Sequence, residues 1–213
     1  MSRLTPERGF SSQEQIAAML GGEILRGIHR PGDNLPPEPE LMERFHVSRT
    51  VLREVMKTLS AKGFILSKTR VGTRVRDPVY WSLFDADVLA WRVQIGLDDR
   101  FLASLREIRR AVEPAAAALA ARRRTSTNIL RLRSCVRQMG RSGHTRQSFA
   151  DADLDFHVEI GIASGNPLMR SLASVVEAAL AASFSQSSAV DDPSEHEIAV
   201  NGHAAIVDAI EAR

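Results

Sequence analysis

The feature that most constrains this fold is the segment at residues 35–54, which reads LPPEPELMERFHVSRTVLRE. It predicts two short helices joined by a tight turn at His46-Val47. The first helix spans residues 38–45 and has proline in or beside its first turn, where proline costs little. The second helix begins after Ser48, a residue type that caps helix N-termini. We therefore expect a helix-turn-helix around which the neighbouring segments pack.

The flanking segments predict what packs on this unit. A helix over residues 13–27 precedes it, with Ser11 or Ser12 as its N-cap, and two strands at residues 64–66 and 73–75 follow it. Apolar residues recur at helical spacing in all three helices. The positions expected to face inward are Ile16, Met19, Leu20, Ile24, Leu25, Leu41, Phe45, Val51, Leu52, Val55, Met56 and Leu59. Three helices followed by a two-stranded hairpin indicate a winged helix-turn-helix.

The third helix carries polar side chains near its start, namely Arg49, Thr50 and Arg53. An α-helix fits the major groove of DNA, and arginine can bind guanine through two hydrogen bonds. A helix N-terminus also suits phosphate. The alternative is a pair of exposed arginines without a ligand. Their place after a tight turn and before a hairpin containing Arg70 and Gly72 favours DNA contact.

Charge and composition agree with a DNA-binding first third. Residues 1–77 hold 13 Lys and Arg against 9 Asp and Glu, whereas residues 78–213 hold 15 against 17. A basic segment on a near-neutral remainder suits a polyanion-binding domain joined to another domain. A single cysteine, Cys135, excludes an internal disulfide framework and suits a reducing cytosol. The sequence shows no signal peptide and no apolar stretch of membrane-spanning length, so we expect a cytoplasmic protein.

The expected domains are a DNA-binding domain at residues 10–76, a linker and joint at 77–98, and a third region at 99–213. Both tryptophans of the chain, Trp81 and Trp91, fall in the joint. We interpret this apolar stretch as a hydrophobic plug between domains rather than as an aromatic ligand cage, because aromatic residues bury much surface and fix relative orientation.

Beyond residue 98 the periodicity predicts helices and no strands, and therefore an all-helical bundle. The expected helices span about residues 99–121, 126–140, 148–164, 168–185 and 195–212. Asp153 and His157 are one turn apart in the third of these. Such a pair is usually a surface hydrogen bond, but with a histidine from a facing helix it could hold a metal ion. His203 is the candidate, and His196, two turns earlier, is expected to be too distant to share the ion.

The first part of the chain resembles the GntR-type winged-helix domain of bacterial transcription regulators. The matching residues lie between 24 and 75, with Val47-Ser48-Arg49-Thr50-Val51 at their centre. The resemblance implies that the operator is contacted from the recognition helix and the wing. The implied contact residues are Ser48, Arg49, Thr50, Arg53, Thr69, Arg70, Gly72 and Thr73. Many relatives have a polar residue where this chain has Pro39, so a contact from that position is not expected.

The remainder resembles the FCD ligand-binding domain of the FadR branch, through residues 106–114, Asp153 to Leu168, and His203 to Ile210. The joint is similar to that of sugar-acid repressors such as those of galactonate operons. The resemblance implies a divalent metal, zinc or a similar ion, on Asp153, His157 and His203. It also implies an organic-acid effector on Arg109 and Asn166, because arginine pairs with carboxylates.

In metal-binding members of that family a fourth histidine lies on a following helix. The sequence ends at Arg213, so we expect a bundle without its last helix and with three of the four ligands. The favoured function is a homodimeric regulator that represses a sugar-acid or other organic-acid catabolic operon. We expect a small organic acid to change its affinity for DNA. One alternative is a constitutive DNA binder. Another is a metal-dependent hydrolase with Glu113 or Glu159 as its general base.

Overall fold

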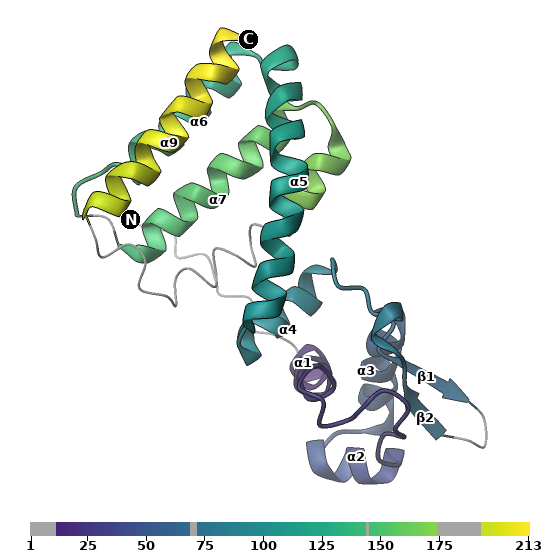
Figure 1. The fold of residues 1–213 in the computed structure, drawn as a ribbon. Helices are drawn as coiled ribbons and strands as arrows, with labels where there is room; N and C mark the ends of the chain where they lie inside the picture. Colours follow the sequence, from purple (N-terminus) through teal and green to yellow (C-terminus); the bar gives the residue numbers. More distant parts are fainter. Residues whose placement is uncertain (1–11, 69–71, 144, 174–192) are drawn as a thin grey trace, which may run out of the picture. The chain divides into compact units, whose positions relative to one another are not determined.

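The computed structural model describes residues 12–68, 72–143, 145–173 and 193–213. The chain divides into two compact units, Met1–Ile95 and Gly96–Arg213, and each has its own hydrophobic core. The N-terminal unit contains helices and a two-stranded antiparallel sheet, and the described part of the C-terminal unit is helical (Figure 1). The predicted fold class, mainly α with a two-stranded wing, is thus confirmed.

The N-terminal unit has the element order of a winged helix-turn-helix. Its helices are α1 (Ser12–Leu25), α2 (Glu38–Phe45), α3 (Arg49–Ala61) and α4 (Ala86–Ile95), with a short 3-10 turn, η1 (Pro78–Tyr80). Strands β1 (Ile65–Lys68) and β2 (Gly72–Val75) form the hairpin, with Ile65 opposite Val75 and Lys68 opposite Gly72. α1 packs on α3 and α4, and α2 packs on α3. Among the residues predicted to face inward, Leu20, Leu41, Leu52, Val55 and Leu59 are fully buried, whereas Met19 is exposed.

The tight turn between α2 and α3 is built from local hydrogen bonds. His46 ends α2 in the left-handed conformation, at φ 51°, and its N–H bonds back to the carbonyl of Glu43. The side-chain oxygen of Ser48 then accepts the N–H of Val51 at 3.4 Å, which satisfies one free donor at the start of α3. The predicted turn and N-cap are confirmed, and they fix the position at which α3 begins.

The aromatic residues of the joint belong largely to the N-terminal unit. Trp81 stacks on the buried Phe64 with a ring-centroid distance of 4.9 Å, and Trp91 lies 5.9 Å from the same ring. Both tryptophans pack against the core that α1, α3 and the hairpin form. Beside them the buried Lys62 ammonium binds Asp85 at 2.5 Å and Asp87 at 2.7 Å. The structure therefore places the predicted plug on the winged helix, where it ties α4 to the end of α3.

Gly63 permits this close approach. Its φ is +81°, and a Cβ added there would lie 1.9 Å from the carbonyl oxygen of Tyr80. We expect Gly63→Ala to lower the free energy of unfolding of the N-terminal unit by about 3 kcal/mol or more, because the backbone must shift as well as strain. Urea unfolding followed by tryptophan fluorescence measures this unit, since both tryptophans lie in it.

Gly27→Ala is the matched control for this substitution. Gly27 has a similar φ of +75°, but nothing lies within 4 Å of an added Cβ. The free energy of unfolding of this variant should fall by only about 1 kcal/mol, the cost of placing alanine in the left-handed conformation. Equal losses in the two variants would show that the contact with Tyr80 does not matter.

The described C-terminal unit consists of α5 (Asp99–Arg123), α6 (Ser126–Met139), α7 (Arg146–Ala163), a helical segment at residues 167–173, and α9 (Pro193–Ala212). α7 packs on α5 and α6, and α9 packs on the same two helices (Figure 1). The core between them is apolar, with Leu132, Met139, Phe156 and Val207 fully buried. No strand occurs in this part of the described chain, as predicted.

Several helix boundaries differ by about two residues from the sequence-based expectation; α1 ends at Leu25 and α5 at Arg123. α7 begins at Arg146 rather than Ser148, because Thr145 and Ser148 cap each other's backbone N–H reciprocally. α9 begins at Pro193 rather than Glu195. Most of the helix predicted at residues 168–185 lies outside the described residues. None of the described helices is both long and apolar enough to cross a bilayer.

Candidate DNA-binding surface and effector cavity

The N-terminus of α3 presents the predicted DNA-binding residues to solvent. Arg49, Thr50 and Arg53 are exposed, while the opposite face of the helix is buried through Leu52, Val55 and Leu59. Arg49 Nε lies 3.7 Å from a carboxylate oxygen of Glu38 on α2, and both side chains are more than half exposed. An exposed pair at that distance is weak. A phosphate or base can therefore displace it at little cost.

The hairpin supplies the second part of this surface. Gly72 opens β2 at φ +98° with nothing within 4 Å of an added Cβ, so its backbone is accessible. Thr73 pairs with Ser67 across the hairpin at 2.9 Å between hydroxyl oxygens. The two other predicted wing residues, Thr69 and Arg70, lie outside the described residues. The structure thus positions the base of the wing and the two strands that lead to its tip.

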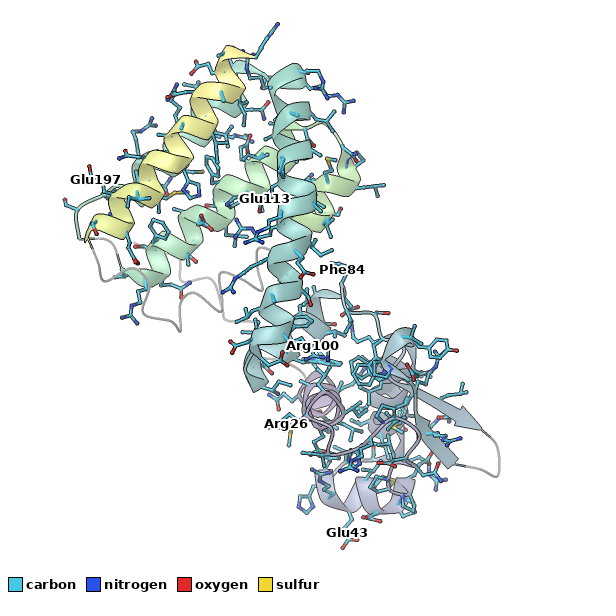
Figure 2. The ribbon with its side chains drawn as sticks, in the orientation of Figure 1. Arg26, Glu43, Phe84, Arg100, Glu113 and Glu197 are labelled. Atoms are coloured by element: carbon cyan, nitrogen blue, oxygen red, sulfur yellow. The ribbon has the colours of Figure 1, made fainter. Side chains whose placement is uncertain are left out.

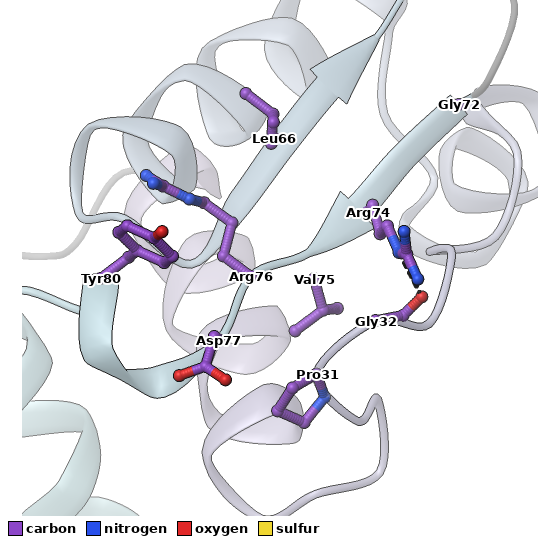
Figure 3. Close-up of a pocket in the computed structure, with 9 residues that line it drawn as sticks. All are labelled: Pro31, Gly32, Leu66, Gly72, Arg74, Val75, Arg76, Asp77 and Tyr80. Carbon is purple, nitrogen blue, oxygen red and sulfur yellow. Dashed lines mark hydrogen bonds between the residues drawn. The ribbon is translucent and has the colours of Figure 1, made fainter.

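A cavity of about 480 Å³ lies beside the base of this hairpin, lined in part by Pro31, Leu66, Arg74 and Tyr80 (Figure 3). Arg74 Nε donates to the carbonyl of Gly32 at 2.6 Å. The Arg76 guanidinium lies over the Tyr80 ring, 4.0 Å from its centroid. Both arginines are therefore engaged within the unit, where they link the loop at Gly32 and the turn η1 to β2.

In the C-terminal unit, three predicted metal ligands converge from two helices. Asp153 and His157 come from α7 and His203 comes from α9, and one ligand atom of each lies within 4.8 Å of the others. Asp153 Oδ1 is 2.9 Å from His203 Nε2 and 3.6 Å from His157 Nε2. His203 Nδ1 donates to the carbonyl of Ala199 at 2.7 Å, which turns Nε2 toward the cluster. Such a backbone bond is how metal-binding histidines are usually oriented.

The protonation of this cluster depends on its burial and its charges. Burial acts to raise the pKa of Asp153, but the imidazoles of His157 and His203 outweigh it and hold that pKa well below its usual range. Burial acts to lower the pKa of His203, but its bonds to Asp153 and to the Ala199 carbonyl raise that pKa above the ordinary value. The Asp153 carboxylate therefore favours the protonated form of His203.

These shifts predict a pH-dependent contribution to stability. The lowered pKa of Asp153 contributes stability above about pH 4, and the raised pKa of His203 contributes it below about pH 6.5. The His203 contribution is lost as pH rises through its raised pKa. We expect Asp153→Asn to cost more unfolding free energy at pH 6 than at pH 9, measured by urea unfolding and circular dichroism with a chelator present.

Asp208→Asn is the control for the pH series. Asp208 pairs with Arg133 at 2.8 Å, and arginine keeps its charge throughout this range. The unfolding free energy that Asp208→Asn loses should therefore be the same at pH 6 and at pH 9. A cost of Asp153→Asn that is equally insensitive to pH would contradict the assigned Asp153–His203 pair.

Arg109 connects this cluster to α5. Its Nη2 lies 2.7 Å from His157 Nε2, and its Nε donates to Glu113 Oε1 at 2.5 Å. Glu113 lies on the face of α5 that turns toward α7 (Figure 2), and Oε1 is 3.4 Å from His157 Nδ1. His157 Nδ1 is buried and has no hydrogen-bond partner among the described residues. His157 thus sits between a guanidinium on one nitrogen and a carboxylate near the other.

A cavity of about 390 Å³ opens onto the cluster. Arg109, Asp153, His157 and His203 line it. Further lining residues, not predicted as site residues, are Arg146, Phe149, Glu195 and His196. Arg146 was expected in a loop, yet it starts α7 and lies two turns before Asp153. The Thr145–Ser148 capping pattern, together with the seven-residue spacing, is the signal that could have identified it.

His196 and Asn166 are the two other residues that the sequence raised for this region. His196 Nε2 bonds to the carbonyl of Met139 at 2.8 Å, so it lines the cavity but is not part of the metal cluster, as expected. Asn166 does not line this cavity. Its Oδ1 accepts the backbone N–H groups of Leu168 and Met169, at 3.0 and 3.4 Å, and so caps the helical segment that follows.

The fold and the two sites define a class of protein: a winged-helix DNA-binding domain joined to a helical ligand-binding domain. Comparison with known families gives the same division. Residues 12–75 match the gntR family of bacterial regulatory proteins, and residues 104–213 match the FCD domain. The chain belongs to the GntR family of transcription regulators and carries an FCD domain.

Individual relatives support this assignment. The chain is 32% identical over 201 residues to the galactonate operon transcriptional repressor of Escherichia coli, covering 94% of this chain and 87% of that protein. It is 34% identical to YieP, an uncharacterised HTH-type transcriptional regulator of E. coli, covering 92% and 84%. A solved structure of Lar, which controls expression of the Listeria monocytogenes agr system, shares the fold at a TM-score of 0.58 and 18% identity, covering 97% and 94%.

The chain is accordingly a DNA-binding transcription regulator with a ligand-sensing domain. Its domains and these relatives are regulators rather than enzymes, so the hydrolase alternative is not supported.

Proposed function

We propose that this protein represses an operon for the breakdown of a sugar acid, and that the sugar acid releases it from DNA. The C-terminal cavity is the effector site in this proposal. The observation that carries it is the convergence of Arg109, Arg146 and the Asp153–His157–His203 cluster on one cavity. Arginine pairs with carboxylate, and the polar cluster suits hydroxyl groups or an ion that binds them. The similarity to a galactonate operon repressor makes galactonate the first compound to test.

The metal is part of the proposal. One carboxylate and two imidazoles are ligands that suit zinc and similar divalent ions. Two observations support the fit: the ligand atoms lie close together, and the Ala199 carbonyl holds His203 with Nε2 toward Asp153. A bound ion would supply a positive centre for the effector's carboxylate or hydroxyl oxygens. Asn166, whose side-chain oxygen caps the helical segment that follows it, does not line this cavity.

On the DNA side, we propose that a homodimer places two α3 helices in successive major grooves of a pseudo-palindromic operator. Arg49 and Arg53 would contact bases or phosphates, and Ser48 and Thr50 would contact phosphates. The wing residues Thr69, Arg70, Gly72 and Thr73 would contact the backbone or the minor groove. The exposed N-terminus of α3 and the open backbone at Gly72 support these roles.

A mobility-shift titration tests the function. The operator is first selected from random DNA by the protein, and binding is then measured with zinc and increasing galactonate. We expect galactonate to weaken operator binding at least 10-fold, whereas galactose, which lacks the carboxylate, should have no effect. If no sugar acid changes operator binding, the sensor proposal fails and the constitutive DNA binder becomes the better description.

A further inference from the structure

Arg109 is hydrogen-bonded to Nε2 of His157, the atom through which His157 would bind a metal ion. The Nη2–Nε2 distance is 2.7 Å, and a guanidinium offers only hydrogen-bond donors. His157 Nε2 must therefore accept that bond through its single lone pair. Asp153 Oδ1 lies 3.6 Å from the same nitrogen, beyond hydrogen-bonding distance. Metal coordination at Nε2 uses the same lone pair, so the guanidinium and an ion exclude each other there.

Charge strengthens this exclusion. A guanidinium beside His157 places a positive charge where a divalent cation would arrive. The side chains of His157 and Arg109 are 7% and 19% exposed, so water screens the repulsion only partly. In this arrangement Asp153, His157 and His203 lie together, but Arg109 blocks the nitrogen of His157 that would bind an ion.

The block is reversible by rotation of one side chain. Arg109 Nε is bound to Glu113, a contact that does not involve His157. Nη2 can therefore leave His157 while Nε keeps its bond to Glu113. Glu113 Oε1 also faces His157 Nδ1 at 3.4 Å. When Nε2 binds an ion, this carboxylate is in place to accept the Nδ1 proton, which is the usual support for a metal-bound histidine.

We propose that Arg109 blocks metal binding at His157 Nε2, and that the carboxylate of an effector draws the Arg109 guanidinium away from this nitrogen. This inference rests on the proposed function, because it assumes a carboxylate in the cavity that Arg109 lines. A carboxylate pairs with the guanidinium through two hydrogen bonds and offsets its charge. His157 Nε2 then becomes available. Effector and metal consequently bind with positive coupling, and each raises the affinity of the other by the same factor.

The test measures zinc affinity by competition with a chromophoric chelator at pH 7.5. Cobalt absorption provides an independent record of coordination. Wild type and Arg109→Leu are titrated alone, with galactonate, and with galactose. We expect galactonate, but not galactose, to tighten zinc binding to wild type by 10-fold or more. Arg109→Leu should bind zinc at least 10-fold more tightly than wild type without galactonate, and galactonate should add nothing.

Arg110→Leu is the matched control, because it removes a neighbouring exposed arginine from the same helix. It should behave as wild type. If Arg109→Leu loses the helical circular dichroism signal, Arg109→Gln replaces it, since a shorter neutral side chain also cannot hold His157. Equal zinc affinities of wild type and the Arg109 variant without galactonate would overturn the proposal that Arg109 blocks metal binding. The zinc-only comparison decides this even if galactonate proves not to be an effector, whereas the mobility shift decides the proposed function.

Discussion

Replacing Arg49 by alanine should weaken operator binding by about 1–3 kcal/mol, roughly 5- to 150-fold, and relax specificity if Arg49 reads a guanine. Arg49 lies in the first turn of α3 and is exposed, and its partner Glu38 is distant enough to be displaced. A bidentate contact to guanine distinguishes bases, whereas a phosphate contact does not. Affinities for the selected operator and for random DNA of the same length measure both quantities.

The double variant Arg49→Ala, Arg53→Ala should reduce operator binding to near the level of random DNA. Arg53 lies one turn further along the same helix and is also exposed. If either arginine contacts only phosphate, its loss should weaken all sequences alike and lower the salt dependence by about one counterion. The salt dependence of each single variant therefore separates base reading from phosphate binding.

Lys57→Ala is the control within the same helix. Lys57 lies two turns beyond Arg49 and pairs with Glu54 at 2.6 Å. It should retain operator binding close to that of the wild type. If the double arginine variant binds the operator as tightly as Lys57→Ala, α3 is not the recognition helix.

The second large effect is expected at the cluster in the C-terminal unit. With galactonate present, Asp153→Ala and His203→Ala should each weaken zinc binding by 100-fold or more, because each removes one of only three described ligands. Both variants should still bind the operator but should no longer be released by galactonate. Isothermal titration with zinc and the mobility shift measure these two properties separately.

His196→Ala is the control for zinc binding. His196 lines the same cavity, but its Nε2 is bonded to the Met139 carbonyl and lies outside the metal cluster. Its zinc affinity should match that of the wild type. A loss equal to that of His203→Ala would mean that the ion sits nearer the start of α9 than the three predicted ligands place it.

Much of the N-terminal unit follows from signals that are local in the chain. The Ser48 cap, the His46 turn and the apolar stripe of α3 are each set within a few residues, and the structure confirms them. The spacing of Asp153 and His157 also required only helical geometry. The helical character of residues after 98 was likewise predictable, because the apolar period repeats over several turns.

Other features depended on contacts between segments far apart in sequence. The aromatic residues near Trp81 and Trp91 read as a plug between domains, but the decisive partner is Phe64, which α3 and the hairpin hold in the N-terminal core. Asn166, by contrast, is a local case that the sequence reading did not anticipate: its side-chain oxygen accepts the N–H groups of Leu168 and Met169, two and three residues further along. Arg146 is a second local case, because the reciprocal caps of Thr145 and Ser148 place it at the start of α7.

The sequence by itself determined the winged helix-turn-helix, the helical second unit, and which residue types were available for DNA and for a metal. Periodicity, capping and turn chemistry act over a few residues, so they can be recognised from the sequence alone. The tertiary structure decided which of those residues meet. The packing of α7 and α9 against the same two helices, α5 and α6, brings His203 to Asp153, and the packing of α7 on α5 brings Arg109 to His157. Such pairings depend on how each helix is rotated about its own axis. That rotation is set by packing against side chains that are distant in the sequence.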